Sequence, residues 1–232
     1  CTVVGGNGLT ATASTKLSVI PDIPSAPVLT TKLENANGAD YNGNWTSKSI
    51  YISITPGRSV DLIERYEYSL DNKTWTKPNN LSLNGNQGNF VYSSEIDGII
   101  YVRGCNEKGC GEASAGKTLR IDKISPVIKA KNSSNNVQIE ILQNTSSFFT
   151  VTYSKSGGSV SCNPADTSGL ALGTYTVSCI ATGGNGLTAS ASTTLKIVPQ
   201  IPSAPTIITK YENANGNDYN GTWTNKSIYI GI

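Results

Sequence analysis

Histidine and methionine are both absent from this chain of 232 residues. Without histidine, the sequence lacks the commonest general base and the commonest metal-ligating side chain. Lys and Arg number 18 against 16 Asp and Glu, so the net charge is only +2, and there is no basic field to attract nucleic acid. With 37% hydrophobic and 7% aromatic residues, the chain is too polar to insert into a membrane.

Catalytic motifs are also missing. The sequence contains neither the G-x-S-x-G turn of serine hydrolases nor the G-x-x-x-x-G-K loop that binds phosphate. Acidic residues are sparse and scattered, so no pair is positioned by spacing to hydrolyse a glycosidic bond. We therefore expect a protein that is not an enzyme, has no catalytic residues and requires no cofactor.

The chain repeats itself at a fixed offset of 178 residues. Residues 1–54 and 179–232 align without gaps, and 37 of their 54 positions are identical. The chain opens on Cys1 and stops at Ile232, inside an apparent strand. We interpret it as a window on a longer array of two alternating units, because a repeat of this length suits a pair of domains.

Apolar and polar residues alternate with a period of two through most of the chain, as in half-buried strands. Ile50, Ile52 and Ile54 share one face of a predicted strand, and so do Val137, Ile139 and Ile141. Gly-Gly-Asn-Gly at 183–186 predicts a hairpin between two further alternating runs. Many short strands joined by polar turns, without helices, predict an antiparallel β-sandwich architecture.

Prolines divide these strands into domains. Pro21, Pro24 and Pro27 recur one period later as 199, 202 and 205, and such proline-spaced segments stay extended. A shorter joint follows Ile121. We therefore predict four segments, which are the last strands of one domain at 1–20, a complete domain at 24–123, a second complete domain at 125–198, and the first part of another at 202–232.

Five cysteines fit a disulfide framework with one residue left over. Cys105 and Cys110 flank a four-residue hairpin loop and should face each other across two strands. Cys162 and Cys179 each lie on the inward face of an alternating strand, and we pair them as well. Cys1 is the repeat equivalent of Cys179, and its partner would lie outside this window.

A metal site and free thiols are the alternatives to disulfides for these cysteines. Zinc needs about four Cys or His ligands, but the chain has no His and no C-x-x-C spacing. Free thiols are the second alternative. Structural disulfides fit best, and they imply an oxidising compartment, hence an extracellular or cell-surface protein.

The stretch from Val160 to Ile197 contains a set of motif residues, namely Cys162, Pro164, Gly173, Thr174, Val177, Cys179, Ala181, Gly184 and Asn185. On these residues, the segment 125–198 resembles a hyalin-repeat (HYR) domain. One departure is Gly183, where the family usually has Asp.

Four segments characterise residues 24–123, namely Trp45-Thr46, YEYSLDNKTWT at 66–76, YVRGCNEKGC at 101–110 and LRIDKISP at 119–126. These segments resemble the bacterial immunoglobulin-like (Ig-like) domains found in surface-protein arrays of Gram-positive bacteria. The third of these also resembles the last hairpin of fibronectin type III domains. The resemblances imply tandem immunoglobulin-like or fibronectin type III-like sandwiches in an extracellular, non-enzymatic array.

Two sets of residues are candidates for binding. Tyr41, Trp45 and Trp75 can stack on a sugar or anchor a protein partner if they are exposed, but they can equally pack in or against a core. Glu34 and Asp40 are the charged members of an Asn-rich loop that offers oxygen ligands for calcium. A solvated turn is the alternative for that loop, because Asn and Gly are good turn formers.

The leading hypothesis is a structural spacer in a secreted or cell-surface repeat protein, projecting a distal domain. Its partners would be the neighbouring domains of the same chain. The alternative is an adhesin that binds a host glycan or matrix protein through Tyr41, Trp45 or Trp75. No nucleic acid and no membrane insertion are expected for this segment.

Overall fold

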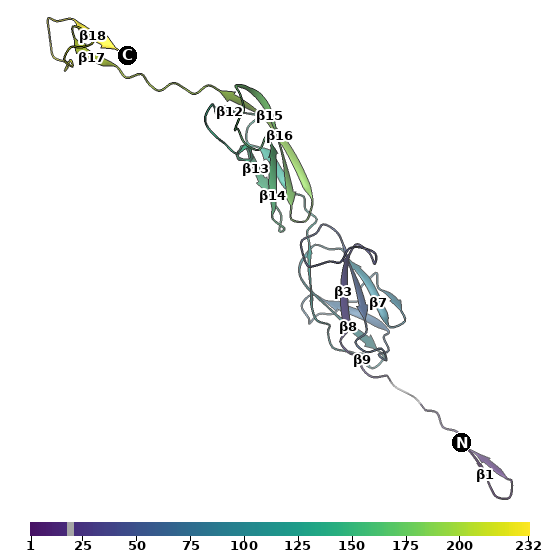
Figure 1. Cartoon of the computed structure of the whole chain (residues 1–232). Helices are drawn as coiled ribbons and strands as arrows, with labels where there is room; N and C mark the ends of the chain where they lie inside the picture. Colours follow the sequence, from purple (N-terminus) through teal and green to yellow (C-terminus); the bar gives the residue numbers. More distant parts are fainter. Residues whose placement is uncertain (18–20) are drawn as a thin grey trace. The chain divides into compact units, whose positions relative to one another are not determined.

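The computed structural model describes residues 1–17 and 21–232 (Figure 1). Residues 18–20, the end of the predicted segment 1–20, lie outside the described part. The chain divides into two compact units. Unit 1 comprises Cys1–Lys129, Thr150–Ser161 and Cys179–Ala191, and unit 2 comprises Ala130–Phe149, Cys162–Ser178 and Ser192–Ile232. In the described residues, no helix is long and apolar enough to cross a membrane.

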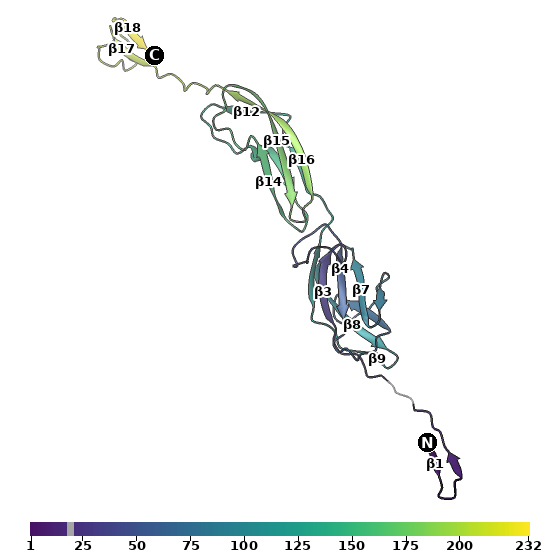
Figure 2. The same cartoon turned by 45° about the vertical axis from the view of Figure 1, so that its right-hand side comes forward.

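Two four-stranded sheets form an Ig-like sandwich in unit 1, hereafter the first sandwich. One has the strand order β3 (Val28–Leu33), β4 (Ile50–Thr55), β7 (Gln87–Tyr92), β6 (Ser82–Asn84). The other has the order β10 (Lys117–Ile121), β8 (Ile96–Asn106), β5 (Arg65–Ser69), and β9 (Gly109–Cys110) pairs with the end of β8. Every one of these pairings is antiparallel, and Figure 2 shows β4 between β3 and β7.

The core of the first sandwich follows the alternation in its strands. Ile50, Ile52 and Ile54 are fully buried on one face of β4, as their spacing predicts. Residues from both sheets complete the core, namely Leu29, Ile63, Tyr66, Phe90, Ile100, Val102, Leu119 and Ile121. Among the described residues, every buried side-chain nitrogen and oxygen has a hydrogen-bond partner. These bonds compensate for the loss of water around the polar residues that are buried beside this core.

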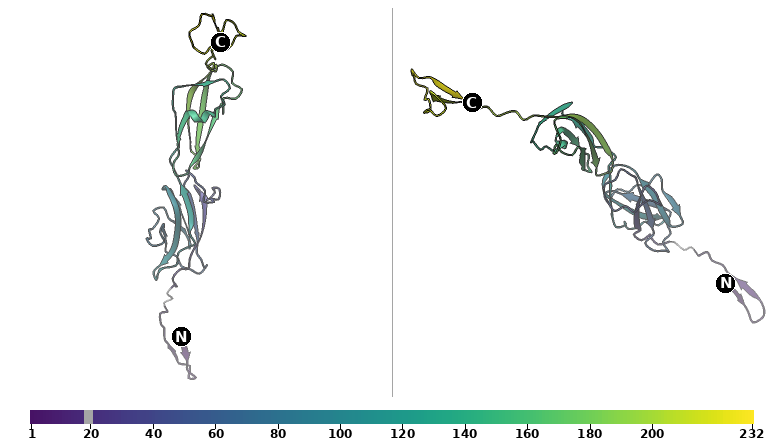
Figure 3. Two further views of the ribbon diagram at one scale, coloured as in Figure 1. Left: turned by 90° about the vertical axis from the view of Figure 1, so that its left-hand side faces the viewer. Right: turned by 45° about the horizontal axis from the view of Figure 1, so that its top comes forward.

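The region predicted as the second domain holds two further sheets. One pairs β11 (Val127–Ala130) with β13 (Phe149–Thr152). The other has the order β12 (Ser134–Gln138), β16 (Thr188–Val198), β15 (Gly173–Gly183), β14 (Gly158–Asn163). A short 3-10 helix, η1 (Thr145–Phe148), precedes β13 (Figure 3). The chain is therefore all-β, as the alternation predicts.

One pairing in this region is parallel. Strand β12 runs alongside β16 in the same direction, with Ser134 opposite Thr194 and Gln138 opposite Val198. Two parallel strands need a long connection between them, and the strands β13, β14 and β15 lie in the chain between these two. One parallel pair of strands thus lies within the fold predicted as antiparallel sandwiches.

The prediction that Val137, Ile139 and Ile141 share one face of a strand is wrong beyond the first residue. Val137 is buried, but β12 ends at Gln138, and Glu140 has a φ of 73°. A residue in the left-handed region reverses the chain and breaks the alternation. Ile139 and Ile141 are therefore 39% and 43% exposed, and they line a pocket instead of the core.

The repeated ends of the chain form two small antiparallel pairs. Strand β1 (Thr2–Val4) pairs with β2 (Thr10–Thr12), and β17 (Ile208–Tyr211) pairs with β18 (Ile228–Gly231). Some apolar side chains in and beside these pairs are exposed, although the equivalent residues in the other copy are buried. Val3 and Leu17 are 67% and 85% exposed, whereas the equivalent Ala181 and Leu195 are fully buried.

Candidate functional site

Tyr41 packs on the first sandwich. It is half-buried against the apolar core, and its hydroxyl oxygen accepts a hydrogen bond from the backbone N–H of Arg120 at 2.8 Å. Burial raises the pKa of the Tyr41 hydroxyl above 10.0, and this outweighs the opposing effects of Arg120. This hydrogen bond connects the loop of Tyr41 to β10. The contact favours a packing role for Tyr41 over stacking on a ligand.

Trp45 is half-buried next to the same strand. Its neighbour Thr46 donates its backbone N–H to the carbonyl oxygen of Arg120 at 3.1 Å, and Thr46 also forms a parallel bridge with Ile121. The segment around Trp45 is thereby attached to the end of β10. In the other copy, the equivalent Trp223 is fully exposed.

Trp75 belongs to a charged surface on the solvent face of β5 and β8, which we call the Arg–Trp patch (Arg65, Glu67, Trp75 and Arg103). The guanidinium carbon of Arg103 lies 4.3 Å from the centre of the Trp75 ring, in cation–π geometry. Arg103 Nη2 also contacts Glu67 Oε2 at 2.8 Å, and Arg65 Nε contacts Glu67 Oε1 at 3.0 Å.

The two guanidinium groups of this patch share one carboxylate, so the patch carries a net charge of +1. Burial raises the pKa of the Glu67 carboxyl, but hydrogen bonds from Arg103 and Arg65 outweigh burial and hold the pKa below its usual value. Glu67 is therefore ionised and shared by two guanidinium groups. Of the three aromatic candidates, only Trp75 is part of this patch. Among the described residues, no ring contact joins it to Tyr41 or Trp45.

The structure closes a disulfide between Cys105 and Cys110, with an S–S distance of 2.01 Å and a Cα–Cα distance of 4.0 Å. The two residues face each other across β8 and β9, around the tight turn at Glu107 and Lys108. Glu67 lies close to both sulfurs, but sulfurs joined to each other are not thiolates and cannot act as metal ligands. Cys162 and Cys179 are also disulfide-bonded, and Cys1 is a free, exposed cysteine.

The Asn-rich loop that offers oxygen ligands for calcium is held by two flanking lysines and by an Asx-turn. Glu34 Oε2 pairs with Lys48 Nζ at 2.9 Å, and Asp40 pairs with Lys32 Nζ at 3.9 Å. The side-chain oxygen of Asn35 accepts the backbone N–H two residues on, as in an Asx-turn. Each carboxylate thus already faces a lysine, which favours the solvated-turn interpretation.

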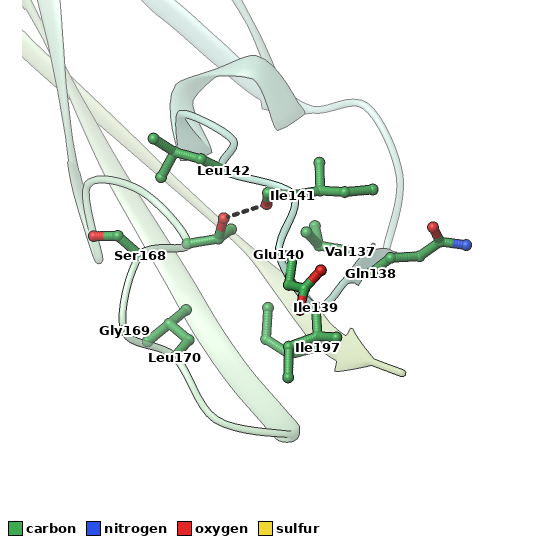
Figure 4. A pocket seen from close by; sticks show the side chains of 11 residues that line it. Val137, Gln138, Ile139, Glu140, Ile141, Leu142, Ser168, Gly169, Leu170 and Ile197 are labelled. Atoms are coloured by element: carbon green, nitrogen blue, oxygen red, sulfur yellow. Dashed lines mark hydrogen bonds between the residues drawn. The ribbon is translucent and has the colours of Figure 1, made fainter. Parts of the chain in front are cut away.

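An apolar pocket of about 310 Å³ lies in unit 2 (Figure 4). Its walls are the turn after β12 and residues 167–170, which are joined by a hydrogen bond from Thr167 Oγ1 to the carbonyl oxygen of Ile141 at 2.9 Å. Glu140 is its one ionisable lining residue. Two smaller pockets in unit 1 share Tyr68, and none of the three brings two carboxylates together.

The polar residues that sequence reasoning missed lie where the proline-rich segment 21–27 enters the first sandwich. Asn106 is buried, and its Nδ2 donates to the carbonyl oxygens of Asp22 at 2.7 Å and Leu62 at 3.3 Å. Asp61, only 3% exposed, accepts hydrogen bonds from the backbone N–H of Ser25 and from its hydroxyl. The only available signal was that these residues are polar and stand next to strands.

Comparison with known proteins adds no family. No protein-family model matches the chain, and no curated protein matches it. Among solved structures it is similar to chicken CNTN1 FN1–FN3 domains, with 12% sequence identity and a TM-score of 0.30 over 82% of this chain and 72% of that one. The fold assignment therefore rests on the sheets described above.

Proposed function

We propose that this chain is a spacer segment of a secreted or cell-surface repeat protein, in which alternating sandwich domains carry a distal domain away from the surface. The observation that carries the proposal is the way in which the proline-rich segment 21–27 is built into the first sandwich. A spacer needs joints that hold their geometry, and a joint made of buried residues does so.

Several contacts hold this segment. Pro24 and Pro27 are buried, and the carbonyl oxygen of Asp22 is held by Asn106. At Gly111 a Cβ atom would come within 1.7 Å of the carbonyl oxygen of Pro24, so only glycine allows the two backbones to lie this close. The segment is therefore packed as part of the sandwich that follows it.

Composition and fold support a structural role for the whole chain. The units repeat, the net charge is small, and disulfides add resistance to unfolding in an oxidising environment. Under this proposal the protein is not an enzyme, its partners are its neighbouring domains, and it works outside the cell. The hyalin-repeat and bacterial Ig-like resemblances belong to the same proposal.

An adhesin remains the second candidate, and the Arg–Trp patch is the observation that favours it. Trp75 is half-exposed and stacked on Arg103, an arrangement that suits stacking on a sugar ring or contact with a protein. Of the three aromatic candidates the patch contains only Trp75, and Tyr41 is engaged with Arg120.

A binding screen separates the two candidates. The oxidised 232-residue chain is applied to an array of glycans and extracellular-matrix proteins, with calcium and with a chelator. We expect no specific binding from a sample whose disulfides are intact. The control is Trp223→Ala, which alters the exposed repeat equivalent of Trp45. Specific binding that is lost in Trp75→Ala and retained in this control would overturn the spacer proposal in favour of the adhesin.

A further inference from the structure

The chain contains the same hairpin turn twice. Residues 5–8 and 183–186 both read Gly-Gly-Asn-Gly, and both are closed by the same hydrogen bonds. In each, the first glycine donates to a leucine carbonyl oxygen at 2.8 Å, and the asparagine side-chain oxygen accepts the N–H of that leucine, at 3.2 Å in the first copy and 3.1 Å in the second. The turns are locally identical, so any difference between them comes from what they touch.

The second copy is seated on the joint that follows the first sandwich, entirely within unit 1. Nδ2 of Asn185 donates to the carbonyl oxygens of Asp122 at 2.8 Å and of Ile124 at 2.9 Å. The backbone carbonyl oxygen of Asn185 accepts the N–H of Ser47 at 3.0 Å. Asn185 is only 4% exposed, whereas Asn7 is exposed.

The neighbouring glycine also fits tightly in the second copy. The N–H of Gly184 donates to the carbonyl oxygen of Gly157 at 2.9 Å, and a Cβ atom at Gly184 would come within 2.3 Å of the carbonyl oxygen of Ser156. A Cβ atom at Gly6 would meet nothing within 4 Å. Glycine is thus required for close approach in the copy that is seated and not in the other.

Asp122 completes the arrangement. Its carboxylate is 1% exposed and accepts hydrogen bonds from the Ser154 hydroxyl and from the backbone N–H groups of Ser156 and Ile124, both at 3.1 Å. Its own N–H donates to the carbonyl oxygen of Thr46 at 3.0 Å. The amide of Asn185 therefore binds the backbone of the short sequence Asp122-Lys123-Ile124, and the carboxylate of Asp122 orders the same sequence.

We propose that the Gly-Gly-Asn-Gly hairpin is a docking element that recognises the Asp-Lys-Ile end of an Ig-like unit through the asparagine amide. In this chain the second copy is docked on residues 122–124. The first copy offers the same groups to the corresponding end of another copy of the unit. The proposal rests on the spacer function, since it identifies the partner surface with which successive units join.

The repeat supplies a matched pair of variants to test this. Asn185→Asp and Asn7→Asp both keep the side-chain oxygen that closes the turn, but they replace the amide donor with an acceptor. Opposite the two carbonyl oxygens of 122–124, that acceptor is repulsive and leaves them unpaired. Amide hydrogen exchange of the full chain is measured at Ser47, Ile124 and Ser156, the N–H groups around the joint, and at the core strands β4 and β8.

We expect exchange at the three joint amides to rise at least about tenfold in Asn185→Asp, with β4 and β8 unchanged, and no change anywhere in Asn7→Asp. Unchanged joint amides in Asn185→Asp would overturn the proposal. So would equal effects of the two variants, because the amide would then act only within its own turn. Gly184→Ala against Gly6→Ala repeats the comparison without altering polarity, and equal exchange in this pair would count against docking as well.

A longer chain tests recognition of another copy. When a second copy of residues 21–178 is placed directly before Cys1, the first hairpin follows an Ig-like unit of its own. There, Asn7→Asp should acquire the effect seen at Asn185, with faster exchange at the new joint. If Asn7→Asp leaves amide exchange at the new joint unchanged in this longer chain, the proposal is overturned. These amide rates do not depend on the array screen, so failure of the docking proposal and failure of the spacer proposal are distinguishable.

Discussion

At the scale of single residues, the informative positions are polar and buried. Asp61, Asn106, Asp122 and Asn185 are each less than 5% exposed, and each bonds the chain segment that enters or leaves the first sandwich. Burial of such groups is costly unless every donor and acceptor is matched. Because their partners are mostly backbone groups of the joints, these residues fix where the chain runs as well as how stably it folds.

Asp61 should make the stability of the first sandwich depend on pH. Burial raises the pKa of its carboxyl, but hydrogen bonds from Ser25 and Arg58 outweigh burial and place the pKa below 3.8. A lowered native pKa stabilises the fold fully above 3.8, and this stabilisation is lost as the pH falls through the native value. Asp61→Asn should therefore cost about 1–3 kcal/mol at neutral pH and progressively less in acid.

Urea unfolding of the wild type and Asp61→Asn at neutral pH and at a series of acid pH values checks this prediction. A destabilisation that is the same at every pH would show that the loss comes from geometry and not from the charge of Asp61. Asp40→Asn is a suitable control, because the side chain of Asp40 is 91% exposed.

At the scale of strands, the repeat places one sequence in two environments. The strands β3 and β4 pair in the same antiparallel sense as β17 and β18. Ile52 and its equivalent Ile230 differ greatly in exposure, at 0% and 62%. Pairing between neighbouring strands therefore forms from the local sequence, whereas burial depends on the second sheet of the sandwich.

Replacing these two isoleucines by alanine should have very different effects. Ile52→Ala leaves a cavity in the core of the first sandwich and should cost about 2–5 kcal/mol of unfolding free energy. Ile230→Ala removes an exposed side chain and should change stability by less than about 0.5 kcal/mol. Both are measured by urea unfolding followed through the fluorescence of Trp45 and Trp75. Equal losses in the two variants would contradict the burial difference.

At the scale of the whole molecule, the two proline-rich segments behave differently although their sequences are nearly the same. Pro24 and Pro27 are buried on the first sandwich, while the equivalent Pro202 and Pro205 are exposed. The first sandwich therefore orders the segment 21–27, through hydrogen bonds of Asn106 and Asp61. Proline alone reduces the freedom of the chain, but it does not hold the chain in one place.

Limited proteolysis should reveal this difference. A protease of broad specificity should cut within residues 199–206 at least about tenfold faster than within 21–27, since cleavage requires an exposed and deformable backbone. Ile201 is 74% exposed and its equivalent Ile23 is 46% exposed. Mass spectrometry of the fragments at early times gives the two rates. Similar rates would mean that segment 21–27 is not held by the first sandwich.

Sequence patterns predicted a strand correctly where the alternation of apolar and polar residues continues along the whole strand. The buried face of β4 at Ile50, Ile52 and Ile54 followed from spacing alone. The prediction failed at Ile139 and Ile141, because the chain reverses at Glu140, and glutamate is not a residue type that indicates a turn. The candidate aromatics were equally ambiguous, since a sequence does not show that Tyr41 is bound to Arg120, 79 positions away.

The two copies of the repeat separate what the sequence determined from what the tertiary structure decided. The Asx-turn at Asn35 recurs at Asn213, and the left-handed Glu34, with a φ of 67°, recurs at Glu212, with a φ of 66°. Such features form between residues a few positions apart, so the local sequence fixes them in either environment. The partial burial of Trp45, the full burial of Ile52 and the docking of Asn185 depend on segments distant in the chain. Ile52 is buried only when two sheets pack together, because apolar area leaves water at that step, and Asn185 docks only where the joint 122–124 lies beside its hairpin.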